Sequence, residues 1–143
     1  MVFSLKKYAI IFSGLLIAIC IIASSHYIKS QQNRLKQDGI INNPLVNDLY
    51  IVNYKLLFSD FDPIYKYGVM KIERMNDRKI EFIISTVSYQ KVSSVERDIR
   101  KKDIEKKDYF DHKPLHIKMK NIKELRVLGT IKSVVRYPVK TNP

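Results

Sequence analysis

An uncharged apolar segment near the amino terminus constrains this chain more than any other feature. The 21 residues from Tyr8 to Ile28 contain no Asp, Glu, Lys or Arg. A helix rises about 1.5 Å per residue, so this segment would span roughly 30 Å, the thickness of a bilayer's hydrocarbon core. A soluble helix would show a polar stripe at helical spacing, whereas residues 10–23 are apolar on all sides apart from Ser13 and Cys20. The sequence therefore predicts a helix that contacts membrane lipid through residues 8–28.

Such a segment is either a retained anchor or a cleaved leader. Two lysines precede the apolar core and small residues follow it, as in a signal peptide cut before His26. The core from Tyr8 to Ala23 has 16 residues, which is long for a leader and favours a retained anchor. The flanking positive charges are nearly balanced. Because the amino-terminal head is short, we expect it to stay inside and the rest to lie outside the cytoplasm, at the cytoplasmic (inner) membrane.

The rest of the chain has room for one small domain. The sequence has 143 residues, and about 115 follow the apolar segment. Cys20 is the only cysteine, so no intramolecular disulfide can form and the domain depends on its core. The expected organisation is a membrane anchor over residues 1–28, a polar linker over 29–43, a small basic domain over 44–138 and a loose tail over 139–143.

Alternating apolar residues predict a domain built mainly of strands. The expected elements are, in order, a strand over residues 47–58, a hairpin over 67–87, a helix over 88–107, a strand over 115–120, a short helix from 121 to the terminator Gly129, and a strand over 130–137. This order resembles that of small SH3-like barrels, where a hairpin lies in mid-chain and a short helical turn precedes the last strand. The resemblance implies an α+β domain, mostly antiparallel and in the form of a partly open barrel, with residues 88–107 as an inserted helix. It implies no function.

The charge balance favours anionic partners. Lys and Arg number 26 against 14 Asp and Glu, a formal net charge of +12. Such a surplus suits nucleic acid, anionic headgroups or acidic wall polymers. Residues 96–108 hold six bases and five acids, with acid-first pairs at i,i+4 such as Asp98–Lys102 and Asp103–Lys107, which favours a solvated helix face. The surplus lies in residues 109–143, which carry eight bases and two acids.

The last two predicted strands carry outward-facing bases. Alternation points Lys118 and Lys120 away from the core, and Lys132 and Arg136 share a face. If the two strands are neighbours, these four residues form one basic ribbon. We expect such a ribbon to contact acidic headgroups, a wall polymer or an acidic partner protein; the alternative is a surface that only aids solubility.

A loop before the hairpin is a second candidate interaction site. Tyr65, Lys66 and Tyr67 suit protein binding because aromatic residues are enriched at interfaces. Asp60 and Asp62 precede them beside a proline, and this composition favours a turn over a catalytic pair.

The sequence contains little that indicates catalysis. Its four glycines are far apart, so no phosphate loop is present, and no serine lies in a nucleophile turn. His112 and His116 would be more than about 12 Å apart on an extended strand, too far to share a metal ion. The sequence predicts no cofactor and no metal site.

We therefore expect a non-catalytic, membrane-anchored envelope protein. Its basic domain would bind a macromolecular partner, a protein or an anionic envelope polymer, in an accessory, assembly or immunity-like role. One alternative is a hydrolase whose site is built from Asp60, Asp62, His112 and His116. Another is a nucleic-acid binder facing the cytoplasm, which is disfavoured because Tyr50 and Tyr54, the candidate stacking residues, share an alternating apolar face. The pattern leaves the oligomeric state open.

Overall fold

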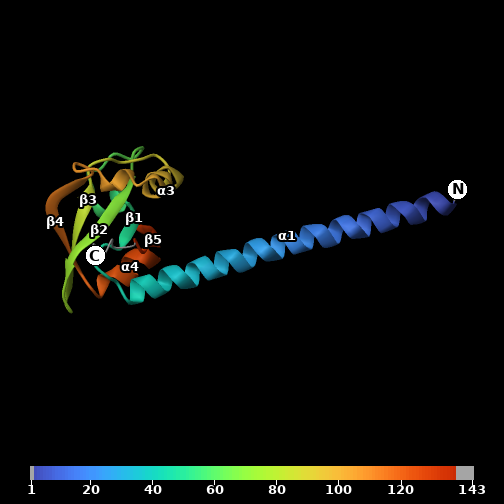
Figure 1. The fold of residues 1–143 in the computed structure, drawn as a ribbon, viewed down its shortest axis with the longest axis horizontal. Coiled ribbons are helices and arrows are strands. Elements are labelled where there is room, and N and C mark those ends of the chain that lie inside the picture. Colours follow the sequence, from blue (N-terminus) through green and yellow to red (C-terminus); the bar gives the residue numbers. More distant parts are fainter. Residues whose placement is uncertain (1, 138–143) are drawn as a thin grey trace, which may run out of the picture. The chain divides into compact units, whose positions relative to one another are not determined.

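The structure is a computed structural model that describes residues 2–137, with side chains from Leu15 onward. The predicted tail over 139–143 lies outside the described residues. The chain divides into two compact units, Met1–Lys36 and Gln37–Pro143. The first unit is helical, and the second is an α+β unit built around an antiparallel sheet (Figure 1).

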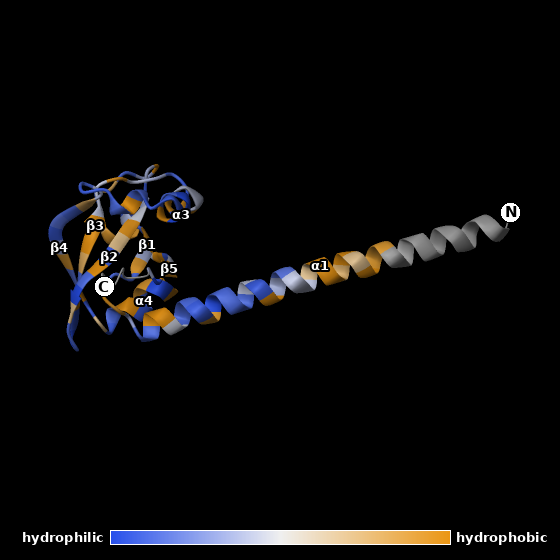
Figure 2. Ribbon diagram, in the orientation of Figure 1, coloured by the Kyte–Doolittle hydropathy of each residue, from blue (hydrophilic) through white to orange (hydrophobic). Residues whose placement is uncertain are grey.

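Helix α1 runs from Val2 to Asn42. An apolar stretch precedes a mostly polar one along it (Figure 2). Among the side chains that the structure describes, no helix carries a stretch both long and apolar enough to cross a membrane. The side chains of residues 8–14, the first part of the predicted lipid-contacting segment, are not among those that the structure describes.

Residues 29–42, all but the last residue of the linker expected over 29–43, continue α1. The last residues of this helix belong to the second unit, where Ile40 and Ile41 are buried. The polar, turn-forming composition of this stretch predicted a solvated linker, and it gave no sign that Ile40 and Ile41 are core residues.

The sheet in the described part of the chain is open and has five strands in the order β4-β3-β2-β1-β5, all antiparallel. The strands are β1 (Leu49–Asn53), β2 (Tyr67–Met75), β3 (Lys79–Ser85), β4 (Phe110–Lys118) and β5 (Ile131–Val135). The mostly antiparallel α+β class predicted from the sequence is confirmed. The predicted hairpin is β2–β3, whose turn is closed by the Asn76 side chain, which accepts hydrogen bonds from the backbone N–H of Arg78 and Lys79.

The first strand is shorter than the alternation predicted. It ends at Asn53, whose side-chain oxygen accepts a hydrogen bond from the N–H of Lys55 at 3.1 Å and caps the short helix α2 (Tyr54–Leu57). As a result Leu56, which alternation along a strand over 47–58 would place on the same face as Tyr54, is 54% exposed.

The predicted helix over 88–107 is also shorter. Helix α3 (Val92–Lys101) ends where Lys102 adopts a positive φ of 62°, and a 3-10 turn, η1 (Asp103–Glu105), follows. Because the α-helix does not continue past Lys102, Asp103 and Lys107 are not paired along one α-helix as predicted. Lys106 instead bonds Asp103 at 2.7 Å.

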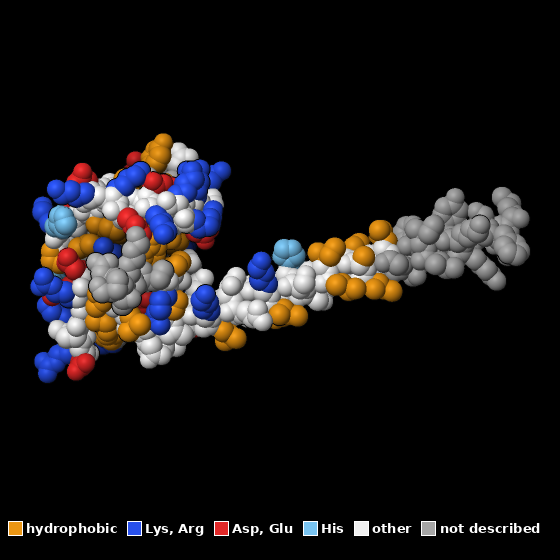
Figure 3. All heavy atoms as spheres, in the orientation of Figure 1, with side chains coloured by type: hydrophobic (Ala, Val, Ile, Leu, Met, Phe, Trp, Pro, Cys, Tyr) orange, Lys and Arg blue, Asp and Glu red, His pale blue; other side chains and the backbone are white. Residues whose placement is uncertain are grey.

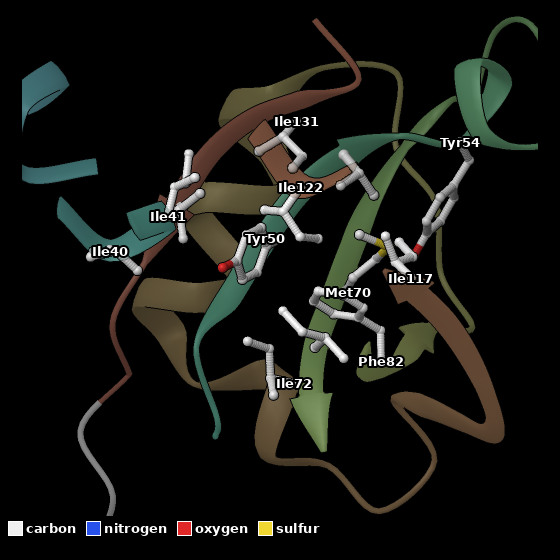
Figure 4. Close-up of a cluster of buried hydrophobic side chains, with 13 residues drawn as sticks. Ile40, Ile41, Tyr50, Tyr54, Met70, Ile72, Phe82, Ile117, Ile122 and Ile131 are labelled. Atoms are coloured by element: carbon white, nitrogen blue, oxygen red, sulfur yellow. The ribbon is translucent and has the colours of Figure 1, made fainter. Parts of the chain in front are cut away.

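Both faces of the sheet carry a hydrophobic core. Alternate residues of β1 lie in different clusters: Tyr50 and Val52 in one, Leu49 and Ile51 in the other. Helix α4 (Asn121–Val127) contributes Ile122 to the first cluster, which Figure 4 shows, and α3 contributes to the second. Tyr50 and Tyr54 are almost fully buried, which confirms their assignment to the core and removes them as stacking residues.

Candidate binding groove

The four residues of the predicted basic ribbon do not lie on neighbouring strands. β5 pairs with β1 and β4 pairs with β3, so the two strands are opposite edges of the sheet. The prediction of one continuous ribbon is therefore wrong. It assumed that strands close in sequence are adjacent, whereas β5 returns to the far side of β1.

Arg136, one of the four, has a structural partner. Its Nε lies 3.0 Å from Oδ1 of Asp48 and its Nη2 lies 2.9 Å from Oδ2, and Nη2 also donates to the carbonyl oxygen of Asn43 at 2.7 Å. The N–H of Leu45 donates to the same carboxylate at 2.8 Å. The side chain of Asp48 is only 1% exposed, so it depends on these donors, and its hydrogen bonds raise the pKa of Arg136. We therefore assign Arg136 a role in stabilising the fold rather than in binding a ligand.

Lys132 is exposed on the β5 edge, away from β4. Its carbonyl oxygen accepts a hydrogen bond from Nη1 of Arg126 at 2.6 Å, and Nη2 of Arg126 donates to Gln37 at 2.9 Å. Arg126 thus links α4, β5 and the end of α1.

Lys118 and Lys120 line a groove of about 660 Å³ together with bases that the sequence pattern did not single out. Four exposed cationic side chains border it, and we call the site they define the basic groove: Arg78, Lys118, Lys120 and Lys123. Lys and Arg side chains are spread over the visible face of this unit (Figure 3).

Strand pairing brings these bases together. Lys79 is opposite Lys118, and the N–H of Met119 donates to the carbonyl oxygen of Arg78 at 3.0 Å, which places the hairpin turn beside the end of β4. Lys123 follows in the first turn of α4. Alternation within single strands could not reveal this cluster, because its members come from a turn, a strand end and a helix.

The basic groove has an apolar part and few acids. Ile41, which is buried, and Met119, which is half-buried, line it beside the exposed amide of Asn42. Among the described residues that line the groove, Asp77 is the only acid. The arrangement suits an anionic ligand that also has an apolar portion.

The predicted partner loop is only partly free. Tyr65 is 48% exposed, but Tyr67 begins β2, exchanges backbone hydrogen bonds with Tyr89, and packs against the second core cluster. The Lys66 ammonium lies 5.7 Å from the centroid of the Tyr67 ring.

Asp62 lies in a turn, as the two aspartates beside a proline predicted. Its Oδ1 accepts hydrogen bonds from the N–H of Ile64 at 2.6 Å and of Tyr65 at 3.1 Å. This carboxylate therefore organises the loop before β2.

In the described part of the chain, no polar contact brings together the aspartates and histidines of the hydrolase alternative. Among the described residues, no hydrogen bond or ion pair joins Asp60 or Asp62 to His112 or His116, and no three His, Cys, Asp or Glu side chains are grouped to hold a metal ion. His116 lies 3.7 Å from Glu81, whose pKa is lowered by its hydrogen bond with Lys79.

Comparisons of the chain with protein-family models, with curated proteins and with solved structures found no match.

Proposed function

We propose that the protein is a membrane-tethered, non-catalytic binding protein of the cell envelope, whose small basic domain binds an anionic macromolecule in the basic groove. The observation that carries the proposal is the convergence of Arg78, Lys118, Lys120 and Lys123 around one groove with a single carboxylate, Asp77, among its described lining residues. An accessory, assembly or immunity-like role fits such a protein. We also propose that the domain resembles a small SH3-like barrel in the order of its elements. This resemblance concerns the fold and implies no function.

Electrostatics supports binding of an anion. A groove lined by charges of one sign raises the local concentration of the opposite charge. The Arg78 guanidinium can bond a carboxylate or phosphate with two parallel N–H groups, and the lysines add mobile point charges. Since all four side chains are exposed, a ligand can reach them without rearranging the core.

The tether is supported by the sequence and by exposure along α1. The segment from Tyr8 to Ile28 has no formal charge, and the large apolar side chains from Leu15 to Ile28 are 56–67% exposed. Apolar surface of this extent is costly in water, and a lipid bilayer would cover it. The proposed location is the cytoplasmic membrane, with the basic domain outside the cytoplasm.

Charge reversal tests the proposal. The groove variant carries Lys118→Glu, Lys120→Glu and Lys123→Glu. The control variant carries the same charge change on the α3 side, as Lys91→Glu, Lys101→Glu and Lys107→Glu. All six side chains are exposed. In the groove variant, residue 118 faces Lys79 across the sheet, so a glutamate there relieves a like-charge pair.

The readout is the salt concentration that elutes the full chain, in neutral detergent micelles, from a polyglutamate resin. We expect the wild type and the control variant to elute at similar high salt, and the groove variant to pass through near the starting salt. Equal retention of all three would contradict the proposal. Equal loss in both variants would show that net charge, and not the groove, controls binding, and would also contradict it.

A further inference from the structure

The basic groove adjoins β4, an edge strand of the sheet in the described part of the chain, through Lys118, the last residue of that strand. The N–H of Met119 donates to the carbonyl oxygen of Arg78, so these residues form a hydrogen-bonded pair across β3 and β4. In an antiparallel ladder such pairs alternate with pairs whose backbone groups point outward. The backbone groups of His116 and Lys118 therefore point away from β3. β4 is an edge strand, so they face the open side of the sheet.

The neighbouring strand confirms this alternation. The residue opposite Lys118 is Lys79, whose carbonyl oxygen accepts a hydrogen bond from the N–H of Asn76, on the side of β2. Lys79 thus directs its backbone away from β4, as the partner of an outward-facing residue must.

We propose that the occupant of the basic groove is an extended segment of a partner protein, with alternating acidic and apolar side chains, that adds as a further strand to the edge of β4. The inference rests on the proposed function and names its partner class. An added strand gains main-chain hydrogen bonds from His116 and Lys118, while its alternate side chains reach the groove.

The two kinds of side chain have separate partners. The acidic ones meet Lys118, Lys120 and Lys123. The apolar ones meet the exposed part of Met119, beside the buried Ile41, and the flexible thioether of methionine adapts to different side chains. A groove of about 660 Å³ has room for a few side chains rather than for a folded domain.

A uniformly charged ligand fits less well. A phosphate polymer or a lipid headgroup would leave the exposed part of Met119 uncovered and would bring charge against Asp77. A peptide can place an uncharged residue opposite Asp77 and its acids opposite the lysines.

Two features of β4 limit how long a peptide segment can pair with its edge. The pairing of β3 with β4 shifts register between Phe82 and Ile84, and Pro114 has no N–H to offer. The regular edge is therefore Leu115–Lys118, which would pair with a short segment of about four residues.

Binding of defined probes to the full chain in neutral detergent micelles tests the inference. The first probe is a fluorescent hexapeptide of alternating glutamate and isoleucine with blocked ends. The second is the same peptide N-methylated at every internal amide, which keeps the side chains and charges but removes the main-chain donors. Polyphosphate and vesicles of phosphatidylglycerol represent the other anionic partners. Each probe is measured with the wild type and with the groove variant by fluorescence anisotropy or sedimentation.

We expect the unmodified peptide to bind the wild type at least about tenfold more tightly than the N-methylated peptide, and at least about tenfold more tightly than it binds the groove variant. Equal affinity of the two peptides would overturn strand addition. If polyphosphate or the vesicles bind through the groove and the peptide does not, the inference fails while the proposed function stands. If no probe distinguishes the wild type from the groove variant, both fail.

Discussion

The guanidinium of Arg136 is joined to the carboxylate of Asp48 by two hydrogen bonds of 3.0 Å and 2.9 Å, which link the residue after β5 to the residue before β1. The carboxylate is almost fully buried, so loss of the arginine would leave an uncompensated charge inside the protein. Arg136→Met should lower the free energy of unfolding by about 2–3 kcal/mol, less than for a fully buried pair because the Arg136 side chain is 41% exposed.

Thermal unfolding of the full chain in detergent, followed by circular dichroism, measures this effect. Lys132→Met removes a nearby exposed cation and should leave stability within about 0.5 kcal/mol of the wild type. The double variant Asp48→Asn/Arg136→Met should recover part of the loss, because it no longer buries an unpaired charge. An Arg136→Met protein as stable as the wild type would contradict the structural role of this pair.

Because of the buried hydroxyl of Tyr54, the stability of the second unit should fall as the pH rises through the alkaline range. It donates to the carbonyl oxygen of Val69 at 2.9 Å and accepts from the N–H of Ser85 at 3.1 Å, and burial raises its pKa to about 12. An unfolded tyrosine has a pKa of about 10. The folded chain keeps the proton while the unfolded chain releases it, so this contribution is present below pH ~10 and is lost between pH ~10 and ~12.

Tyr54→Phe should lower stability at pH 7 by about 1–2 kcal/mol, since the N–H of Ser85 loses its acceptor. Between pH ~10 and ~12 the variant should lose less stability than the wild type, because one of the ionisations coupled to unfolding is gone. Urea titrations across this range provide the comparison. An unchanged alkaline slope in Tyr54→Phe would show that this hydroxyl is not the coupled group.

Gly68 is required for space beside Tyr54. A Cβ added at residue 68 would overlap the Tyr54 ring and lie 2.6 Å from its hydroxyl oxygen. Gly68→Ala should therefore destabilise the chain by about 3 kcal/mol. Gly129→Ala is the matched control. Gly129 has a positive φ of 72° but an open surrounding, so the expected loss is only about 1 kcal/mol, from backbone strain. Thermal unfolding ranks the two, and a larger loss at Gly129 would contradict the close packing at Tyr54.

The tether is tested by extraction of membranes with alkaline carbonate. We expect the wild type to remain in the membrane pellet. Ile17→Arg/Ile21→Arg should move the chain to the supernatant, because each central arginine costs about 2.5–3.5 kcal/mol in a membrane helix. Gln31→Arg/Gln32→Arg adds the same charge to the polar part of α1 and should not. Recovery of the uncut wild type in the supernatant would refute the anchor.

The sequence predicted those parts of the fold that short-range patterns control. The β2–β3 hairpin follows from two alternating runs around Asn76, whose side chain closes the turn. The end of β1 does not follow from alternation, because the cap formed by Asn53 overrides it at Tyr54. Similarly, the composition around Gly39 favours a linker, and only tertiary packing buries the two isoleucines that follow it.

The candidate site depended on long-range pairing that one sequence does not reveal. Alternation identifies Lys118 and Lys120 as exposed bases. Arg78 is brought beside them only by the pairing of β4 with β3, and Lys123 by the start of α4. Arg136 is exposed, as alternation predicts, but its ion pair with Asp48 does not follow from the sequence, because the two residues are far apart in the chain.

Site-specific photocrosslinking in native membranes tests the central claim most directly. A photoreactive residue replaces Lys123 in the basic groove or, in a parallel strain, Lys101 at the end of α3. We expect a discrete adduct with an envelope macromolecule from position 123 and none from position 101, and we expect Lys118→Glu/Lys120→Glu to abolish the adduct. An adduct from position 101 but not from 123, or an adduct at 123 that survives both charge reversals, would contradict binding through the basic groove.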